Sequence, residues 1–324
     1  MTYKSSLQGH FLSGRYTPIT LLLLSLTVWG IGVFALPGTP ITICEGVEPG
    51  VASPFLSNAV SLVCTVLCAF LLSPLHFSER RVHWLTALFL WIASLSLFTH
   101  TNVLWSVSAP ISVLLLRMLF VCRPEVRVEG LLFAAFATLG FASLLMPQFL
   151  LLLPLGITYM SMMNVMGVKR IMAAILGLVT PLWLVYGTVY VYQPADVLLI
   201  PLNAGIHSLM SVSFAEPLLI RLLLTFADLA VLLPAAVLFA GSPVPGKPIL
   251  RRRLEFLMLA CVWLMLLSWL YGNDFGLFYV WRLPAIAILA SYILTLKVNK
   301  ATNVYFVFIN LLWLAVAAFS IWQI

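Results

Sequence analysis

Apolar stretches of about the length needed to cross a lipid bilayer recur along the whole chain. A transmembrane α-helix needs about 20 predominantly apolar residues, and eleven segments fit this requirement. They are Thr17–Leu36, Phe55–Leu75, Trp84–Thr99, Val103–Val121, Leu131–Met146, Phe149–Val165, Ile171–Val191, Glu216–Ala240, Leu254–Tyr271, Leu277–Leu296 and Asn303–Trp322. The sequence therefore predicts an all-α, polytopic transmembrane helical bundle that forms a single integral membrane domain over residues 1–324, with no soluble domain.

The side-chain composition argues against a water-soluble fold. Hydrophobic residues make up 63% of the 324 residues and charged residues only 8%, whereas a soluble domain carries about 25% charged residues. The 17 basic and 10 acidic side chains cannot give a chain of this size a polar surface. Soluble enzymes and nucleic-acid-binding proteins are disfavoured, and we expect the partners to be membrane lipid and other membrane proteins, with no nucleic acid.

The positions of lysine and arginine predict the orientation in the membrane, because cytoplasmic loops carry an excess of these residues. With Lys4 and Arg15 of the N-terminus in the cytoplasm, the loops that hold basic residues all fall inside: 76–83, 122–130, 166–170, 241–253 and 297–300. The outer loops 37–54, 100–102, 147–148, 193–215 and 272–276 lack them. The C-terminus then lies outside, and 193–215, which prolines interrupt, is expected to be interfacial or re-entrant.

Ionisable side chains within or beside the apolar stretches are the candidate substrate-binding residues. A charge near the middle of the membrane costs about 2.5–3.5 kcal/mol on insertion scales and usually marks a pathway or a site. Asp228 is the deepest of them, and Arg221 lies seven residues earlier, about 10 Å away on the same helical face. Arg282 lies about two turns in from Asp274, and His100 stands in a short outer turn.

Each of these residues also has a purely structural interpretation. Arg221 can extend its side chain to the outer interface, as long basic side chains near helix ends do. Asp228 can pair with an arginine inside the bundle, and Arg282 can belong to a structural ion pair. His100 can serve only to form its turn.

Several motifs in the middle of the chain carry a family resemblance. The stretch Val103–Val191 holds EGLLFAAFATLG from Glu129 to Gly140, then Pro147-Gln148, Lys169-Arg170 and Gly177-x-x-Thr180-Pro181. It resembles an uncharacterised family of bacterial multi-pass inner-membrane proteins, which implies a location in that membrane. Automated labels sometimes call its members beta-carotene monooxygenase. Carotenoid-cleaving oxygenases hold iron with four histidines on a β-propeller, so that activity does not fit an all-helical chain.

The same stretch more distantly resembles the GT-C glycosyltransferases, which use polyprenyl-phosphate-linked sugars as donors at the outer membrane face. In that class an acidic pair in the first outer loop serves the acceptor or a metal. By position, the resemblance implies Glu45 and Glu48 as the catalytic acids and a divalent cation as the cofactor. It implies Arg221 and Arg282 as ligands of the lipid phosphate. The acids here form a Glu-x-x-Glu pattern, in place of the tight Asp-Asp or Asp-Glu pair of the class.

Three functions remain open at this point. The first is a GT-C-like transferase that handles polyprenyl-phosphate-linked sugars at the outer face, with Glu45 and Glu48 as the acids. The second is a transporter or lipid flippase, which would use Asp228 together with Arg221. The third is a non-catalytic assembly or scaffold subunit of the membrane, in which the polar residues serve packing alone.

Overall fold

The computed structural model describes residues 17–35, 54–75, 82–96, 99, 102–122, 128–192, 209–213, 219–241, 248–296 and 300–322. The α-helices in these ranges are α2 (Thr17–Ala35), α3 (Pro54–Leu72), α4 (Val82–Ser94), α6 (Val103–Val121), α7 (Glu129–Leu145), α8 (Leu153–Met162), α9 (Val168–Tyr192), α11 (Leu219–Gly241), α12 (Pro248–Leu270), α13 (Phe275–Leu296) and α14 (Lys300–Trp322). Short 3-10 turns are η1 (Ser73–Leu75), η2 (Pro147–Leu152) and η3 (Gly272–Asp274). The only β-pairing within these ranges is an isolated bridge between Ser213 and Tyr271.

Each of the eleven segments predicted from the sequence overlaps one of these helices, so the all-α bundle is confirmed. Seven helices within the described ranges are long and apolar enough to cross a membrane, namely α3, α6, α9, α11, α12, α13 and α14. The protein is therefore embedded in a membrane. Crossing by all eleven helices and the sides on which the two termini lie stay predictions. Most of the expected interfacial segment 193–215 lies outside the described residues.

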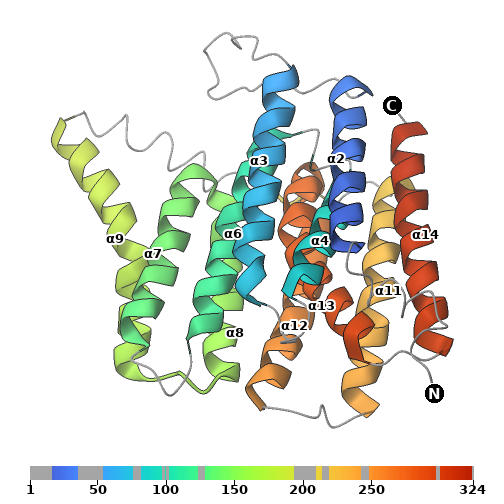
Figure 1. Cartoon of the computed structure of the whole chain (residues 1–324). Coiled ribbons are helices and arrows are strands. Elements are labelled where there is room, and N and C mark those ends of the chain that lie inside the picture. Colours follow the sequence, from blue (N-terminus) through green and yellow to red (C-terminus); the bar gives the residue numbers. More distant parts are fainter. Residues whose placement is uncertain are drawn as a thin grey trace.

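The helices stand side by side and run alternately up and down, as Figure 1 shows. The first turns of α9 and α12 lie at the lower end of the bundle in that view. These turns carry Lys169 and Arg170 in α9 and the run Arg251–Arg253 in α12, the residues that the sequence places inside. The lower end is therefore the side that we expect to face the cytoplasm, and the upper end is the expected outer side.

Local polar and proline residues fix where several helices begin. Asn102 caps α6, because its Oδ1 accepts hydrogen bonds from the backbone N–H groups of Leu104 (3.0 Å) and Trp105 (3.4 Å). Such a side chain satisfies N–H groups that have no partner within the helix. Pro147 opens η2, where its missing N–H removes no helical hydrogen bond.

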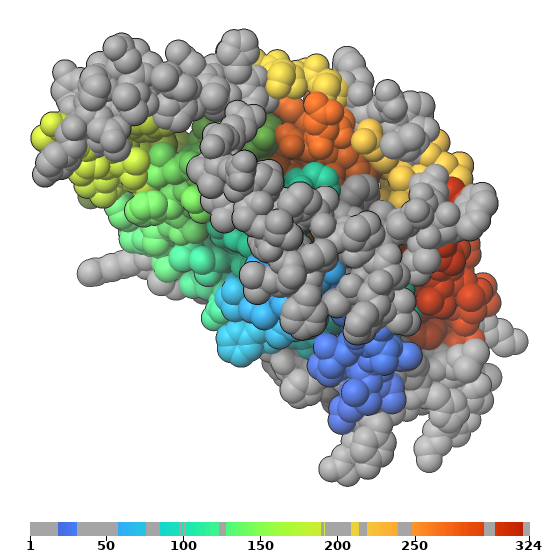
Figure 2. All heavy atoms as spheres, turned by 90° about the horizontal axis from the view of Figure 1, so that it is seen from above, coloured from blue at the N-terminus to red at the C-terminus, as the bar shows by residue number. Residues whose placement is uncertain are grey.

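Helix α13 forms the centre of the bundle, whereas α9 lies at its margin. The apolar window Gly272–Leu294 is 94% buried inside the protein, but the window Val168–Thr188 of α9 is only 17% buried. A helix that is hydrophobic all round is expected at a protein centre or against lipid. Helix α13 lies at the centre of the protein, and α9 exposes most of its apolar surface. Figures 1 and 2 place α9 and α14 at opposite margins of the bundle. We expect their outward apolar side chains to face lipid.

Glycines allow α7 and α9 to pack closely. A Cβ atom on Gly177 would lie 2.3 Å from the carbonyl oxygen of Phe133, and one on Gly140 would lie 2.6 Å from that of Leu178. Small residues at membrane helix interfaces let backbones approach in this way, which increases van der Waals contact. The structure therefore gives a physical reason for Gly140 and Gly177, which stood in the sequence as parts of a family motif.

We expect Gly177→Ala to destabilise the protein by about 1–3 kcal/mol, the usual cost of overpacking, because the new methyl group meets backbone atoms of α7. Gly187→Ala, on the same helix, is the matched control, since nothing lies within 4 Å of its Cβ position. Thermal unfolding in detergent measures both variants. Equal melting temperatures for the two variants would show that this close approach contributes no stability.

Candidate functional site

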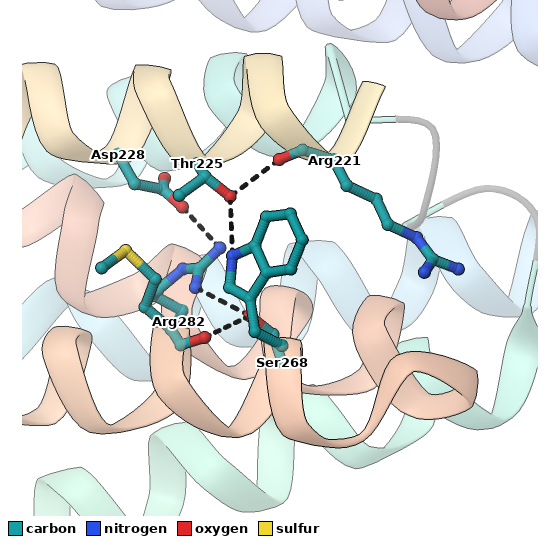
Figure 3. A network of polar contacts seen from close by, with 7 residues as sticks. Arg221, Thr225, Asp228, Ser268 and Arg282 are labelled. Carbon is teal, nitrogen blue, oxygen red and sulfur yellow. Dashed lines mark hydrogen bonds and ion pairs between the residues drawn. The ribbon is translucent and has the colours of Figure 1, made fainter. Parts of the chain in front are cut away.

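A fully buried ion pair joins α11 to α13. Asp228 Oδ2 lies 2.5 Å from Arg282 Nη2, and neither side chain is exposed. Arg282 Nη1 also donates a hydrogen bond of 3.4 Å to Ser268 Oγ on α12, and its guanidinium lies 5.3 Å from the centroid of the Tyr279 ring. Figure 3 shows the guanidinium enclosed between Asp228 and Ser268. The structure therefore brings the two predicted site residues together as partners of each other. A phosphate would have to displace Asp228 in order to bind Arg282.

The ion pair leaves part of its bonding capacity unused. Asp228 Oδ1 and Arg282 Nε are buried and have no hydrogen-bond partner among the described residues. Removing two charges from solvent costs several kcal/mol per ion, and their attraction offsets this cost only when the remaining polar atoms are satisfied. Two well-packed apolar residues would therefore stabilise the bundle about as well as this ion pair does. Because stability alone does not require the two charges, the pair is a candidate for a functional site.

Arg221 lies apart from this pair. Its guanidinium stands 5.3 Å from the centroid of the Phe275 ring, and Figure 3 shows the side chain directed away from Asp228. Its carbonyl accepts a 2.7 Å hydrogen bond from Thr225 Oγ1, which accepts one of 3.3 Å from Trp269 Nε1. The expected separation of Arg221 from Asp228 along one helix is borne out, but the partner of Asp228 is Arg282.

The contacts show that α11 and α13 run in the same direction. Arg221 meets Phe275 and, seven residues later in each helix, Asp228 meets Arg282. Seven residues are about two turns and 10 Å of helix. The cation–π contact therefore lies about 10 Å nearer the upper end of the bundle than the ion pair does.

Asp274 and Gln148 form a second polar contact at the upper end. Gln148 Nε2, in η2, donates a 3.1 Å hydrogen bond to Asp274 Oδ2, in η3. Asp274 precedes Phe275, over which Arg221 lies. We call Gln148, Asp274 and Arg221 the upper polar cluster. Three segments that are far apart in the sequence thus place an amide, a carboxylate and a guanidinium at the expected outer side.

An aromatic pair lies directly below Gln148. The rings of Phe149 and Trp281 are 4.3 Å apart between centroids, and both side chains are buried. Trp281 Nε1 donates a 2.7 Å hydrogen bond to Ser108 Oγ on α6. This bond satisfies the one polar atom of the Trp281 side chain inside the bundle, and it fixes the ring between η2 and α6.

Below these rings, an apolar cavity of about 90 Å³ opens among α6, α7, α8, α12 and α13. We call it the inner pocket. Its walls include Leu115, Phe136, Ala260, Trp281 and Pro284. Binding pockets for small molecules are mostly apolar, with a few polar groups that fix orientation. The inner pocket offers the apolar part of such a site, and Gln148 and Asp274 lie above it. Arg221 lies on the α11 side of α13, away from the residues that line the pocket.

The remaining predicted residues cannot be placed. Glu45, Glu48 and His100 lie outside the described residues. Within the described ranges, the structure contains no group of three or more His, Cys, Asp or Glu side chains that could hold a metal ion. The divalent cation that the glycosyltransferase resemblance implies therefore stays a prediction that depends on Glu45 and Glu48.

Sequence reasoning missed two polar partners and the inner pocket. The sequence places Gln148 in the outer loop 147–148 without indicating a partner for it, and it does not single out Ser268. Both are polar residues at the edge of or inside an apolar stretch, which is the same signal that identified Asp228. The inner pocket has no such signal, because its walls consist of the same apolar residue types as the rest of the bundle.

Comparisons with known proteins add no relative. No family model, no curated protein and no solved structure matches this chain. The two family resemblances therefore depend on the sequence motifs alone.

Removing one partner of the buried ion pair should destabilise the bundle strongly. We expect Arg282→Met alone to cost about 3–5 kcal/mol, because it leaves Asp228 buried without its partner, whereas Arg282→Met with Asp228→Leu should recover most of this loss. Thermal unfolding in detergent measures both. The exposed pair Arg251–Glu255 is the control, since an exposed i,i+4 pair contributes only about 0.3–0.5 kcal/mol. A double variant no more stable than Arg282→Met would contradict this account.

Proposed function

We propose that this membrane protein binds a polyprenyl phosphate and acts as a GT-C-like transferase on the sugar-linked form of that lipid at the outer membrane face. The observation that carries the proposal is the inner pocket, whose wall includes Trp281, below Gln148 and Asp274 at the upper end of the bundle; Arg221 lies at the same end, on the α11 side of α13. A polyprenyl phosphate has a long apolar chain and a charged head, so it needs both environments in this order along the membrane normal.

Arg221 is the residue that we assign to the lipid phosphate. Guanidinium groups bind phosphate oxygens through two parallel hydrogen bonds, and Arg221 is partly exposed at the upper end of α11. Arg282, the other basic candidate, is fully buried in the interior, where a phosphate at the outer face does not reach it. The catalytic acids of this proposal are Glu45 and Glu48, to which the glycosyltransferase resemblance assigns the acceptor or a divalent cation.

A transporter or lipid flippase is the second candidate, and the buried ion pair favours it. Charged residues inside a membrane frequently belong to transport pathways and proton relays. Prolines also interrupt α6, α9, α11 and α13, and proline inside a helix frees a backbone carbonyl. In that mechanism Asp228→Asn would abolish translocation, whereas in a transferase it would affect stability alone.

Filling the inner pocket should abolish lipid binding. We expect Ala260→Leu to lose bound undecaprenyl phosphate, because its added methylenes occupy space in a cavity of about 90 Å³. Val262→Phe, on the lipid-facing side of the same helix (49% exposed), should bind as the wild type does. Native mass spectrometry of protein in mild detergent counts the bound lipid. Retention of the lipid by Ala260→Leu would rule out the inner pocket as its site.

Removing the two outer acids should stop sugar transfer and leave lipid binding intact. We expect Glu45→Gln combined with Glu48→Gln to abolish transfer from a polyprenyl-phosphate sugar, because the acceptor or its metal loses both carboxylates. Membrane insertion and undecaprenyl phosphate binding serve as the controls. Unchanged transfer in this variant would eliminate the transferase assignment, and the flippase would then become the leading candidate.

A further inference from the structure

A second apolar cavity lies at the margin of the bundle. It has a volume of about 290 Å³ and is lined only by apolar residues of α7, α8, α9 and the loop between α8 and α9. Three of its lining residues, Ile157, Met166 and Ile175, are between 43% and 49% exposed. We call this cavity the lateral pocket. Because these residues face outward from a membrane-embedded bundle, lipid chains of the bilayer meet it directly.

One side chain lies between the lateral pocket and the inner pocket. Phe136 of α7 lines both cavities, and its own exposed fraction is 5%. Helix α8 forms the rest of the wall: Leu155 and Gly156 line the inner pocket, whereas Leu153 and Ile157 line the lateral pocket. Among the residues that the structure describes, Phe136 is the one that lines both cavities, so its side chain separates them.

Gly156 determines the space beside that ring. A Cβ atom at Gly156 would lie 3.0 Å from Phe136 Cζ, closer than ordinary van der Waals contact. In most protein interiors a ring is packed on all sides at a density like that of an organic crystal. Phe136 packs against Gly156 on one side and has a cavity on each of two others, so its ring has space into which it can turn.

We infer that the lateral pocket is the site where a lipid chain leaves the bilayer, and that Phe136 is the gate through which the chain reaches the inner pocket. The occupant must be hydrocarbon, because all walls are apolar and an empty cavity loses dispersion contacts with its lining atoms. A single chain fits this geometry, since one ring separates the two cavities. The inference rests on the proposed binding of a polyprenyl phosphate and adds how that lipid arrives.

The test follows a lipid chain through the two pockets over time. The probe is farnesyl phosphate that carries a photoreactive diazirine at the end of its chain, added to protein in vesicles of phosphatidylethanolamine and phosphatidylglycerol. Irradiation at successive times and mass spectrometry of the peptides then report the label in α9, which marks the lateral pocket, and in α12, which marks the inner pocket. Unlabelled farnesyl phosphate competes away any specific label.

We expect label in α9 to precede label in α12 in the wild type. Phe136→Ala, or the milder Phe136→Leu, should raise the rate of α12 labelling several-fold, because a smaller side chain no longer fills the passage. Gly156→Leu should lower that rate several-fold and leave α9 labelling unchanged. Phe141→Ala is the matched control, since Phe141 lies on the same helix, is 53% exposed and lines neither cavity.

The outcomes separate the gate from the binding function. If α12 is labelled at the wild-type rate in Gly156→Leu, or if Phe136→Ala labels it no faster than Phe141→Ala does, the gate is wrong while lipid binding stands. If unlabelled farnesyl phosphate competes at neither pocket, the proposed binding of a polyprenyl phosphate is itself wrong.

Discussion

The hydrocarbon core of a bilayer offers no hydrogen-bond partner to the backbone, and the rest of this structure depends on that constraint. Each N–H and C=O group within the membrane must therefore be satisfied by the chain itself, which leaves the α-helix as the solution for apolar segments of this length. Helices in lipid gain little from further hydrophobic burial, so their association depends on close packing and polar contacts. The glycines between α7 and α9 and the ion pair between α11 and α13 are the two forms of this association.

The sequence predicted the helices well because their signal is local. All eleven apolar segments overlap a helix, and Val103–Val121 has the predicted boundaries. The candidate site was predicted only in part. The distance of a residue from the end of its apolar segment shows how deeply it lies in the membrane, so the sequence identifies Asp228 and Arg282 as buried charges. The sequence positions do not show which helices pack against each other. The partnership of Asp228 with Arg282, the contact of Gln148 with Asp274 and the two cavities all depend on that neighbourhood.

The functional proposals follow from the order of environments along α13. Its upper end follows Asp274, its next two turns contact Arg221 and the aromatic ring of Phe149, and its middle lines the inner pocket. On the side of α13 that lines the inner pocket, the surroundings pass from polar to aromatic to apolar, whereas the side that faces α11 carries the Asp228–Arg282 ion pair. Lipids with one charged head and one long chain have the same order, whereas a small polar solute would find no partner in the lower half of the path.

The buried ion pair also bears on how the protein is made. During synthesis α11 leaves the ribosome before α12 and α13, so Asp228 reaches the membrane before Arg282 exists. Each charge alone is unfavourable in lipid, and each is relieved only when the parallel helices α11 and α13 lie together. The ion pair therefore couples the assembly of α11 with that of α13, because the cost of each buried charge is offset only once its partner helix is in place.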